Sequence, residues 1–331
     1  KLEPIRSNLV PYSQDFSNAS WAKAASTITS NIITSPDGTL NASLFQSNVT
    51  DGYMYPPSSV LSSAANGTFT YSIYAKEGNT SSFTILMTGG ANYVGNFNLT
   101  TVVATTSSAN TTVDISNVGN GWYRCSLIAS LVPSSAYSEL QIGRISSGSN
   151  LYLFGAQLEQ GSYATSIIPT QGSVVTRSSD VCNNGGNEQV INSTEGVLYA
   201  EIKSSTNDIS SYQSIQLGVY GSGVNRIGLG YSSTGNLFVY KNNGVASWNS
   251  QKSSNLKTYN KIAISYSNSV NSFWLNGVKI ATNTSVGELT SQPNILSFNA
   301  PTSAERFYGN TKDLRYYNTA LTDAELQTLT T

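Results

Sequence analysis

Short segments in which apolar and polar residues alternate recur along the 331-residue chain and restrict the folds open to it. Neighbouring side chains of a β-strand point to opposite faces, so one face of residues 67–76 (GTFTYSIYAK) carries Phe69, Tyr71 and Ile73. Residues 121–132 (GWYRCSLIASLV) alternate in the same way, and turns rich in glycine, asparagine and proline separate such segments. The sequence therefore predicts an all-β fold of the sandwich type rather than alternating strands and helices.

Residues 151–177 mark the boundary between two predicted domains. The pattern LYLFGAQLE predicts a half-buried strand with Gln157 and Glu159 on its polar face. Its apolar face is expected to consist of Tyr152, Phe154, Ala156 and Leu158. Glycine and proline interrupt every regular pattern beyond this strand, which indicates an extended strap that leads toward the second domain. We predict that this strap packs on the first sandwich. The length allows two domains, predicted as a β-sandwich at 1–177, a linker at 178–195 and a second β-sandwich at 196–331.

The second predicted domain combines several alternating segments with one helix. Asn276 and Gly277 form a strong hairpin signal, because both residues tolerate the positive φ angles of a two-residue turn. Thr322 and Glu325 have the spacing of a capping box, in which each side chain satisfies a free backbone N–H of the other. The sequence thus predicts one short C-terminal helix and no other.

Composition argues against several classes of function. Charged residues are only 11% of the chain and the formal net charge is -1, so nothing favours nucleic acid as a partner. No apolar run approaches the roughly 20 residues that cross a bilayer, so we expect no membrane insertion. The absence of histidine removes the commonest general base and a usual zinc ligand. The carboxylates are scattered singly, so we predict no catalytic residues, with a two-carboxylate polysaccharide depolymerase as an alternative.

Three motifs of the first domain resemble segments that recur in bacteriophage tail and fibre proteins. They are NLVPYSQDFSNASW at 8–21, PDGT at 36–39 and FGAQLEQGSYATSIIPTQGSVVTR at 154–177. The resemblance covers roughly residues 8–177 and implies a jelly-roll sandwich similar to that of carbohydrate-binding modules.

Two motifs of the second domain resemble laminin-G-like and other concanavalin A-like lectin domains. The first is the hairpin NSFWLNGVKIAT at 271–282, and the second is the closing strand and helix FYGNTKDLRYYNTALTDAELQTLT at 307–330. Together with the first domain, this similarity implies two jelly-roll β-sandwiches in tandem.

The combined resemblance implies a phage tail fibre or tail spike that lies on the virion surface, is extracellular after release, and adheres to a host-surface polysaccharide or other glycan. A structural virion component that contacts other virion proteins is the alternative. Phage fibres are commonly homotrimers, so the resemblance implies a homotrimer, although a monomer fits the sequence equally well. The chain begins at Lys1 without a methionine, and we expect a processed product or part of a longer polypeptide.

Aromatic residues are the main candidates for glycan contact, since a sugar face stacks on tryptophan or tyrosine rings. Trp248 ranks first because it lies in NNGVASWNSQKSSN, which is interpreted as a polar stretch between strands. Tyr231, Tyr240 and Arg226 in the preceding predicted strands are its expected neighbours. The alternative is a ring that covers the sandwich edge or lies in an oligomer contact.

Two further sets of candidates are weaker. Tyr53 and Tyr55 in DGYMYPP form an aromatic loop that could contact a glycan or a protein. Asp208 and Asp37 are candidate ligands for Ca²⁺, which takes carboxylate and carbonyl oxygens. Neither aspartate has an Asp-x-Asp spacing, and an Asp side chain that caps its own turn is the favoured explanation of each position.

Overall fold

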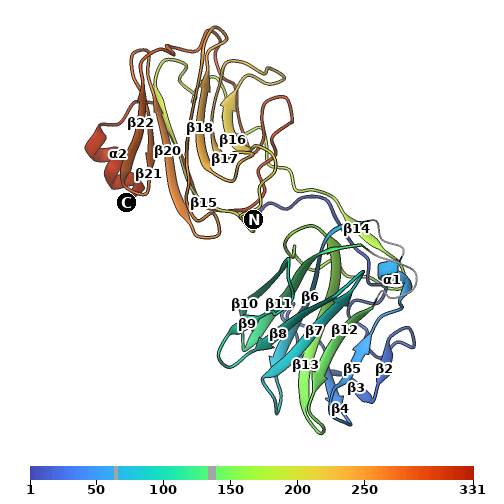
Figure 1. The fold of residues 1–331 in the computed structure, drawn as a ribbon. Helices are drawn as coiled ribbons and strands as arrows, with labels where there is room; N and C mark the ends of the chain where they lie inside the picture. Colours follow the sequence, from blue (N-terminus) through green and yellow to red (C-terminus); the bar gives the residue numbers. More distant parts are fainter. Residues whose placement is uncertain (63–65, 133–138) are drawn as a thin grey trace. The chain divides into compact units, whose positions relative to one another are not determined.

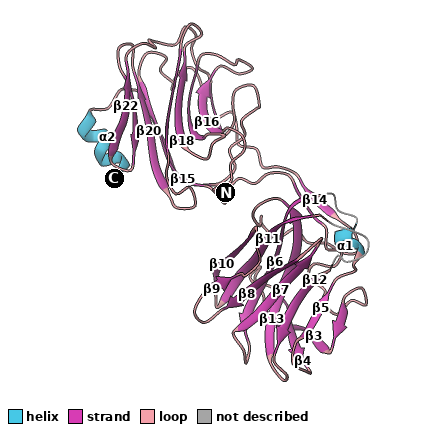
Figure 2. Ribbon diagram, viewed as in Figure 1, coloured by secondary structure: helices cyan, strands magenta, loops and turns pink. Residues whose placement is uncertain are grey.

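β-Strands provide nearly all of the regular structure, and two short helices complete it in the described part of the chain (Figures 1 and 2). A computed structural model gives the structure of residues 1–62, 66–132 and 139–331. The chain divides into two compact units, Ile5–Ser178 and Lys1–Pro4 with Ser179–Thr331. The predicted all-β fold of two β-sandwiches with a short C-terminal helix is confirmed.

Two antiparallel sheets form the sandwich of the first unit. In spatial order, one sheet contains β10 (Thr111–Gly119), β11 (Trp122–Leu131), β6 (Gly67–Glu77), β13 (Asn150–Gln160), β4 (Leu40–Ser47) and β3 (Ser26–Thr34). The other contains β2 (Ala22–Ala24), β5 (Gly52–Tyr55), β12 (Leu140–Ile145), β7 (Ser82–Thr88), β8 (Asn92–Asn98) and β9 (Val103–Thr105). Phe69, Tyr71 and Ile73 are buried in the core, as the alternation predicts. Burial of each such side chain contributes roughly 1.5–3 kcal/mol to stability.

Smaller elements complete this unit. A separate two-stranded sheet pairs β1 (Arg6–Asn8) with β14 (Val175–Arg177). A one-turn helix, α1 (Ser59–Ser62), is an addition to the single helix predicted. Residues 137–144 (YSELQIGR) also have the pattern of a short strand; residues 137 and 138 lie outside the described part of the chain, and β12 covers 140–144.

The predicted face of residues 151–159 is wrong because β13 contains a bulge. Its pairing with β6 shifts register between Phe154 and Gln157, and Gly155 there has a φ of 63°. The bulge changes the phase of the alternation. Tyr152 and Phe154 therefore pack with Trp122 in an outer cluster. The core receives instead Leu151, Leu153, Ala156 and Leu158.

Gln157 and Glu159 are fully buried beneath the strap that follows β13, so the strand is not half-exposed as predicted. The Glu159 carboxylate accepts hydrogen bonds from the backbone N–H of Thr165 (3.0 Å) and from its hydroxyl. Gln157 Oε1 accepts the N–H of Ile168 (2.6 Å), and Arg124 Nη1 donates to the Thr165 carbonyl (2.7 Å). The prediction that the strap packs on the first sandwich is confirmed.

The second unit is a sandwich of two five-stranded antiparallel sheets. One contains β22 (Val278–Asn283), β21 (Asn271–Leu275), β20 (Asn260–Tyr266), β15 (Gly196–Lys203) and β24 (Asn310–Tyr317). The other contains β19 (Ser247–Lys252), β18 (Leu237–Asn242), β17 (Arg226–Tyr231), β16 (Gln213–Gly218) and β23 (Ile295–Ser297). Helix α2 (Asp323–Thr330) begins at the predicted capping box, and its Leu326 packs with Tyr199 and Trp274 on the first of these sheets.

Residues 178–195, predicted as a linker, pack largely with this second sandwich. The Cys182 carbonyl accepts the N–H of Phe298 (2.8 Å), Gly185 pairs with Leu296, and Ile191 is buried in the core. Apolar contact and backbone pairing, which composition does not reveal, thus fix the segment. No helix in the described part of the chain is long and apolar enough to cross a membrane.

One cation lies inside the second sandwich. The side chain of Lys241 on β18 has no exposed surface and shares the inward phase of the strand with Leu237 and Val239. Its Nζ donates to Asn271 Oδ1 (2.8 Å) and to the carbonyl of Ser267 (3.1 Å). These oxygens offset part of the cost of burying the ammonium group.

Candidate functional site

The outer face of the sheet β19-β18-β17-β16-β23 carries the candidate site. Strand β17 (RIGLGY) directs Ile227 and Leu229 into the core and leaves two glycines, Gly228 and Gly230, on the outer face. A Cβ at Gly230 would lie 2.1 Å from the Gln213 carbonyl oxygen, so this position accepts no side chain. The outer face of β17 therefore has no side chain at these two positions, and side chains from the neighbouring strands occupy the space above it.

Register places Gln216, Gly228 and Tyr240 opposite one another on β16, β17 and β18. Gln216 occupies the space above Gly228, because a Cβ there would lie 2.8 Å from Gln216 Cγ. Arg226 lies two residues before Gly228 on β17, so its side chain is on the same face of the sheet. The period of two thus brings one guanidinium, one amide and one aromatic ring together.

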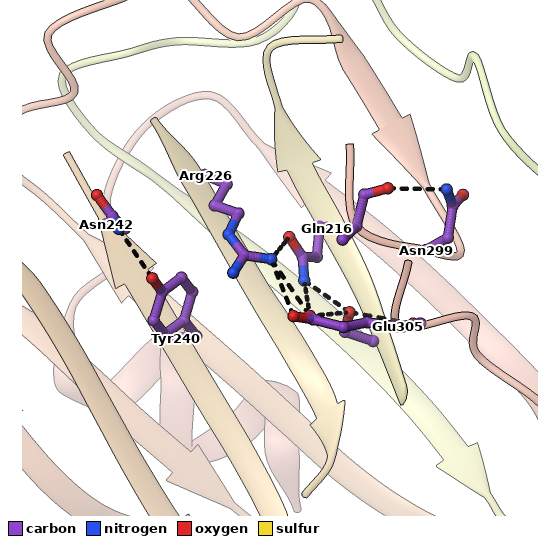
Figure 3. A network of polar contacts seen from close by, with 8 residues as sticks. Gln216, Arg226, Tyr240, Asn242, Asn299 and Glu305 are labelled. Carbon is purple, nitrogen blue, oxygen red and sulfur yellow. Dashed lines mark hydrogen bonds and ion pairs between the residues drawn. The ribbon is translucent and has the colours of Figure 1, made fainter. Parts of the chain in front are cut away.

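Arg226 and Glu305 form the centre of a polar network, which we call the Arg226 network (Figure 3). Arg226 Nη1 lies 3.3 Å from Glu305 Oε1, 3.2 Å from Glu305 Oε2 and 3.2 Å from Gln216 Oε1. Gln216 Nε2 donates to Glu305 Oε2 (2.8 Å), and the Ser214 hydroxyl donates to the same oxygen (3.2 Å). The side chains of Arg226 and Glu305 are 15% and 28% exposed, so solvent reaches the edge of the network.

Tyr240 adds an aromatic ring to the network. The guanidinium carbon of Arg226 lies 4.7 Å from the ring centroid, which is cation–π distance. Asn242 Nδ2 donates to the Tyr240 hydroxyl (2.9 Å) and fixes the tip of the ring (Figure 3). Both the Tyr240 and Asn242 side chains are partly exposed.

Glu305 belongs to a tight loop that sequence reasoning missed. The N–H of Ala300 donates to the Ala304 carbonyl (2.7 Å), and Asn299 Nδ2 donates to the Ala300 carbonyl (2.8 Å). Ser303 and Glu305 have φ angles of 66° and 53°, which cost energy in residues with a Cβ and gather at functional sites. The segment PTSAER has no glycine or asparagine at these two positions, so no residue type there signals the positive φ angles of the loop.

The structure unites only two of the four residues predicted for this site. Arg226 and Tyr240 lie together on the outer face. Tyr231 has no exposed surface and stacks on Phe307 in the core, with ring centroids 5.4 Å apart, so it cannot contact a glycan. Trp248 lies within strand β19 rather than between strands, pairs with the inward-facing Lys241, and packs against the core. The ranking of Trp248 as the first candidate is therefore not supported by its position.

Tyr53 and Tyr55 lie on strand β5 of the first unit, not in a loop. Their ring centroids are 5.8 Å apart, and the Arg144 guanidinium lies 5.0 Å from the Tyr53 ring. Arg144 Nε donates to Gln141 Oε1 (2.8 Å) on the neighbouring strand β12. This group repeats the combination of tyrosine, arginine and glutamine seen in the Arg226 network.

Neither predicted metal ligand lies in an acidic cluster. Asp37 accepts hydrogen bonds from Ser35, Thr39 and Asn41, as a turn-capping aspartate does. Burial favours a higher pKa for Asp37, but these hydrogen bonds outweigh it and lower the pKa to about 2. Asp208 is exposed. Within residues 1–62, 66–132 and 139–331, no three His, Cys, Asp or Glu side chains are grouped as metal ligands.

The Arg226 network has the chemistry of a hydroxyl-binding site. It presents donors on Arg226 and Asn242, acceptors on Glu305, and a ring on Tyr240. A sugar hydroxyl both donates and accepts hydrogen bonds, and its C–H face stacks on aromatic rings.

Comparison with known proteins agrees with the architecture of the second unit. A family model described as the concanavalin A-like lectin/glucanases superfamily matches residues 198–327, and this sandwich has a concanavalin A-like fold. No curated protein matches the chain at a significant level.

Three solved structures illustrate weaker similarity. The chain is 18% identical to the CBM40 of Ruminococcus gnavus IT-sialidase, covering 42% of this chain and 84% of that one with a TM-score of 0.36. The chain is 13% identical to the SAP-like pentraxin of Limulus polyphemus, covering 45% of this chain and 74% of that one with a TM-score of 0.36. It is 10% identical to domains LG4-5 of the mouse laminin alpha1 chain, covering 76% of this chain and 83% of that one with a TM-score of 0.31. These identities and TM-scores are too low to bear on what this chain binds.

Proposed function

We propose that this chain is a non-catalytic glycan-binding protein and that the Arg226 network is its principal binding site. The observation that carries the proposal is the convergence of Arg226, Tyr240, Gln216 and Glu305 on one partly exposed sheet face. Planar polar side chains beside an aromatic ring provide both the hydrogen bonds and the stacking that sugars need. The match of residues 198–327 to a superfamily that includes lectins supports the same function.

The proposed place of the protein is the surface of a bacteriophage virion, as a tail fibre or tail spike that adheres to a host-surface polysaccharide. The motifs at 8–21, 36–39 and 154–177, which resemble phage tail and fibre segments, support it. A homotrimer is part of this proposal. Light scattering of the purified chain measures the oligomeric state directly.

A structural virion component is the second candidate. The motifs at 8–21, 36–39 and 154–177, which resemble phage tail and fibre segments, support this role as well as the adhesin role. A protein with this role would bind a virion partner and no glycan.

A glycan array combined with bacterial capsular and O-antigen polysaccharides tests the principal proposal. The wild-type chain should bind at least one glycan, and Tyr240→Ala should lose most of that binding while keeping its fold. Absence of binding to every glycan would remove the adhesin function in favour of the structural one. Release of reducing ends from a bound polysaccharide would instead establish the depolymerase.

A further inference from the structure

The charges of the Arg226 network bear on the class of glycan that it accepts. We propose that the site selects uncharged glycans over acidic ones and that Glu305 is the residue that sets this specificity. The inference rests on the proposed glycan-binding function and names the ligand class for that site.

The positive charge of Arg226 is already matched within the protein. Its Nη1 contacts both carboxylate oxygens of Glu305, at 3.2 and 3.3 Å. An acidic sugar that approached the guanidinium would place a second carboxylate beside Glu305. Like charges that meet in a partly desolvated site oppose binding strongly.

No second cation in the described part of the chain pairs with Glu305. Arg306, its neighbour in sequence, donates instead to the Ser179 hydroxyl (2.8 Å). Lys241 lies on the core side of the sheet and bonds to Asn271 and Ser267. At Arg226 an acidic ligand would therefore meet a guanidinium whose charge Glu305 already balances, and no second cation is bound to Glu305 among the described residues to offset the added carboxylate.

The atoms that remain available suit a hydroxyl group. Arg226 Nη2 has no hydrogen-bond partner within residues 1–62, 66–132 and 139–331, and Figure 3 shows the contacts of the guanidinium leaving from the other terminal nitrogen. Among the described residues, Glu305 Oε1 accepts only the 3.3 Å contact from Arg226, whereas Oε2 accepts three hydrogen bonds. A hydroxyl can accept from Nη2 and donate to Oε1 at the same time, which a carboxylate cannot do.

The experiment uses a glycan array in which each neutral oligosaccharide is printed beside its congener oxidised at C6 of one hexose to a carboxylate. The pair that contains the tightest-binding oligosaccharide is then selected, and titration calorimetry with the full chain measures the dissociation constant of each member. We expect the wild type to bind the neutral member at least about tenfold more tightly. Glu305→Gln keeps the shape of the side chain and should reduce this ratio to within about threefold.

Glu201→Gln is the matched control, because Glu201 also forms an ion pair, with Lys312 at 2.9 Å, but lies in the other sheet of the same sandwich. It should leave the ratio unchanged. A salt series on the wild type provides a second measurement that needs no variant. The ratio should shrink as the salt concentration rises from roughly 0.05 to 0.5 M, because salt screens partly exposed charges.

Three results would overturn the inference. Equal or tighter binding of the acidic congener by the wild type contradicts it while leaving the glycan-binding function intact. A ratio that persists in folded Glu305→Gln, or that does not respond to salt, contradicts the role of Glu305 alone. Binding of neither member of any pair overturns both the inference and the proposed function.

Discussion

The guanidinium carbon of Arg226 lies 4.7 Å from the centre of the Tyr240 ring, and the two residues come from adjacent strands of one sheet face. This contact holds the ring against a fixed charge on one side, while Asn242 fixes its hydroxyl on the other. The ring therefore loses little freedom when a ligand stacks on it, which favours binding.

Two replacements of Tyr240 should separate the contribution of ring stacking to glycan affinity from the contribution of the tyrosine hydroxyl. We expect Tyr240→Ala to weaken glycan binding roughly 10- to 100-fold, the range of a central aromatic contact. Tyr240→Phe keeps the ring and should cost no more than about fivefold, because it loses one hydrogen bond. Calorimetric titration with the tightest oligosaccharide of the array measures both, and equal losses in the two variants would contradict stacking as the main contribution.

Trp248 is expected to act in stability rather than in recognition. It is partly buried against the core of the second sandwich, so Trp248→Ala should lower the free energy of unfolding by about 2 kcal/mol. Urea titration measures the loss, and glycan affinity of the folded variant should equal that of the wild type. A selective loss of affinity without loss of stability would restore Trp248 as a ligand contact.

The buried Lys241 predicts a pH dependence of stability. Burial lowers the pKa of Lys241 from 10.5 to about 8, against a smaller raising effect of Glu288. Between pH 8 and 10 the unfolded chain therefore binds more protons at this residue than the folded chain, so the contribution of Lys241 to stability rises with pH.

Lys241→Met lacks the titration and serves as the reference for this effect. The free energy of unfolding of the wild type, minus that of Lys241→Met, should rise by roughly 1–3 kcal/mol from pH 8 to pH 10. Urea unfolding at several pH values measures it, and a constant difference would contradict the lowered pKa. The comparison stops at pH 10 because buried tyrosines with raised pKa values, such as Tyr199, destabilise the fold above it.

Arg124 should be essential for the packing of the strap, residues 162–177, on the first sandwich. Its side chain is buried and donates to the Tyr74 hydroxyl (2.8 Å), the Ser72 hydroxyl (2.8 Å) and the Thr165 carbonyl (2.7 Å). Arg124→Met leaves these oxygens without their donor and should cost about 3 kcal/mol. The more exposed Lys76→Met is the control and should change stability by less than about 0.5 kcal/mol.

Hydrogen exchange reports on the strap itself. The amides of Thr165 and Ile168 donate to buried side chains and should exchange slowly in the wild type and much faster in Arg124→Met. Exchange across residues 162–177 at the rate of an unfolded peptide in the wild type would contradict the packing of the strap.

Local patterns predicted the elements that local interactions determine. Alternation identified the inward face of β6, and the capping box located the start of α2, because each depends on neighbours within a few residues. The prediction placed Arg226, Tyr231 and Tyr240 on strands that precede Trp248 and assigned none of them to a face. The period of two in RIGLGY puts Arg226 and Tyr231 on opposite faces of one strand, so both could not belong to the same site.

Features that depend on distant segments escaped prediction. Glu305 reaches the network from a loop about 80 residues beyond Arg226, and neither of the two positive-φ positions in PTSAER carries the glycine or asparagine that would signal that conformation. Strand β19 has mostly polar side chains and forms through backbone pairing with β18, so Trp248 looked like a loop residue. The bulge at Gly155 likewise requires knowledge of β6 as the partner strand.

Hydrogen–deuterium exchange with and without the tightest oligosaccharide tests the location of the binding site most directly. Bound glycan should slow exchange in residues 226–231, 237–242 and 298–306, which contain Arg226, Tyr240, Asn242 and Glu305. Exchange in β20, β21 and β22, in the other sheet, should stay unchanged. Protection confined to that other sheet, or to the first sandwich around Tyr53 and Tyr55, would contradict the Arg226 network as the principal site.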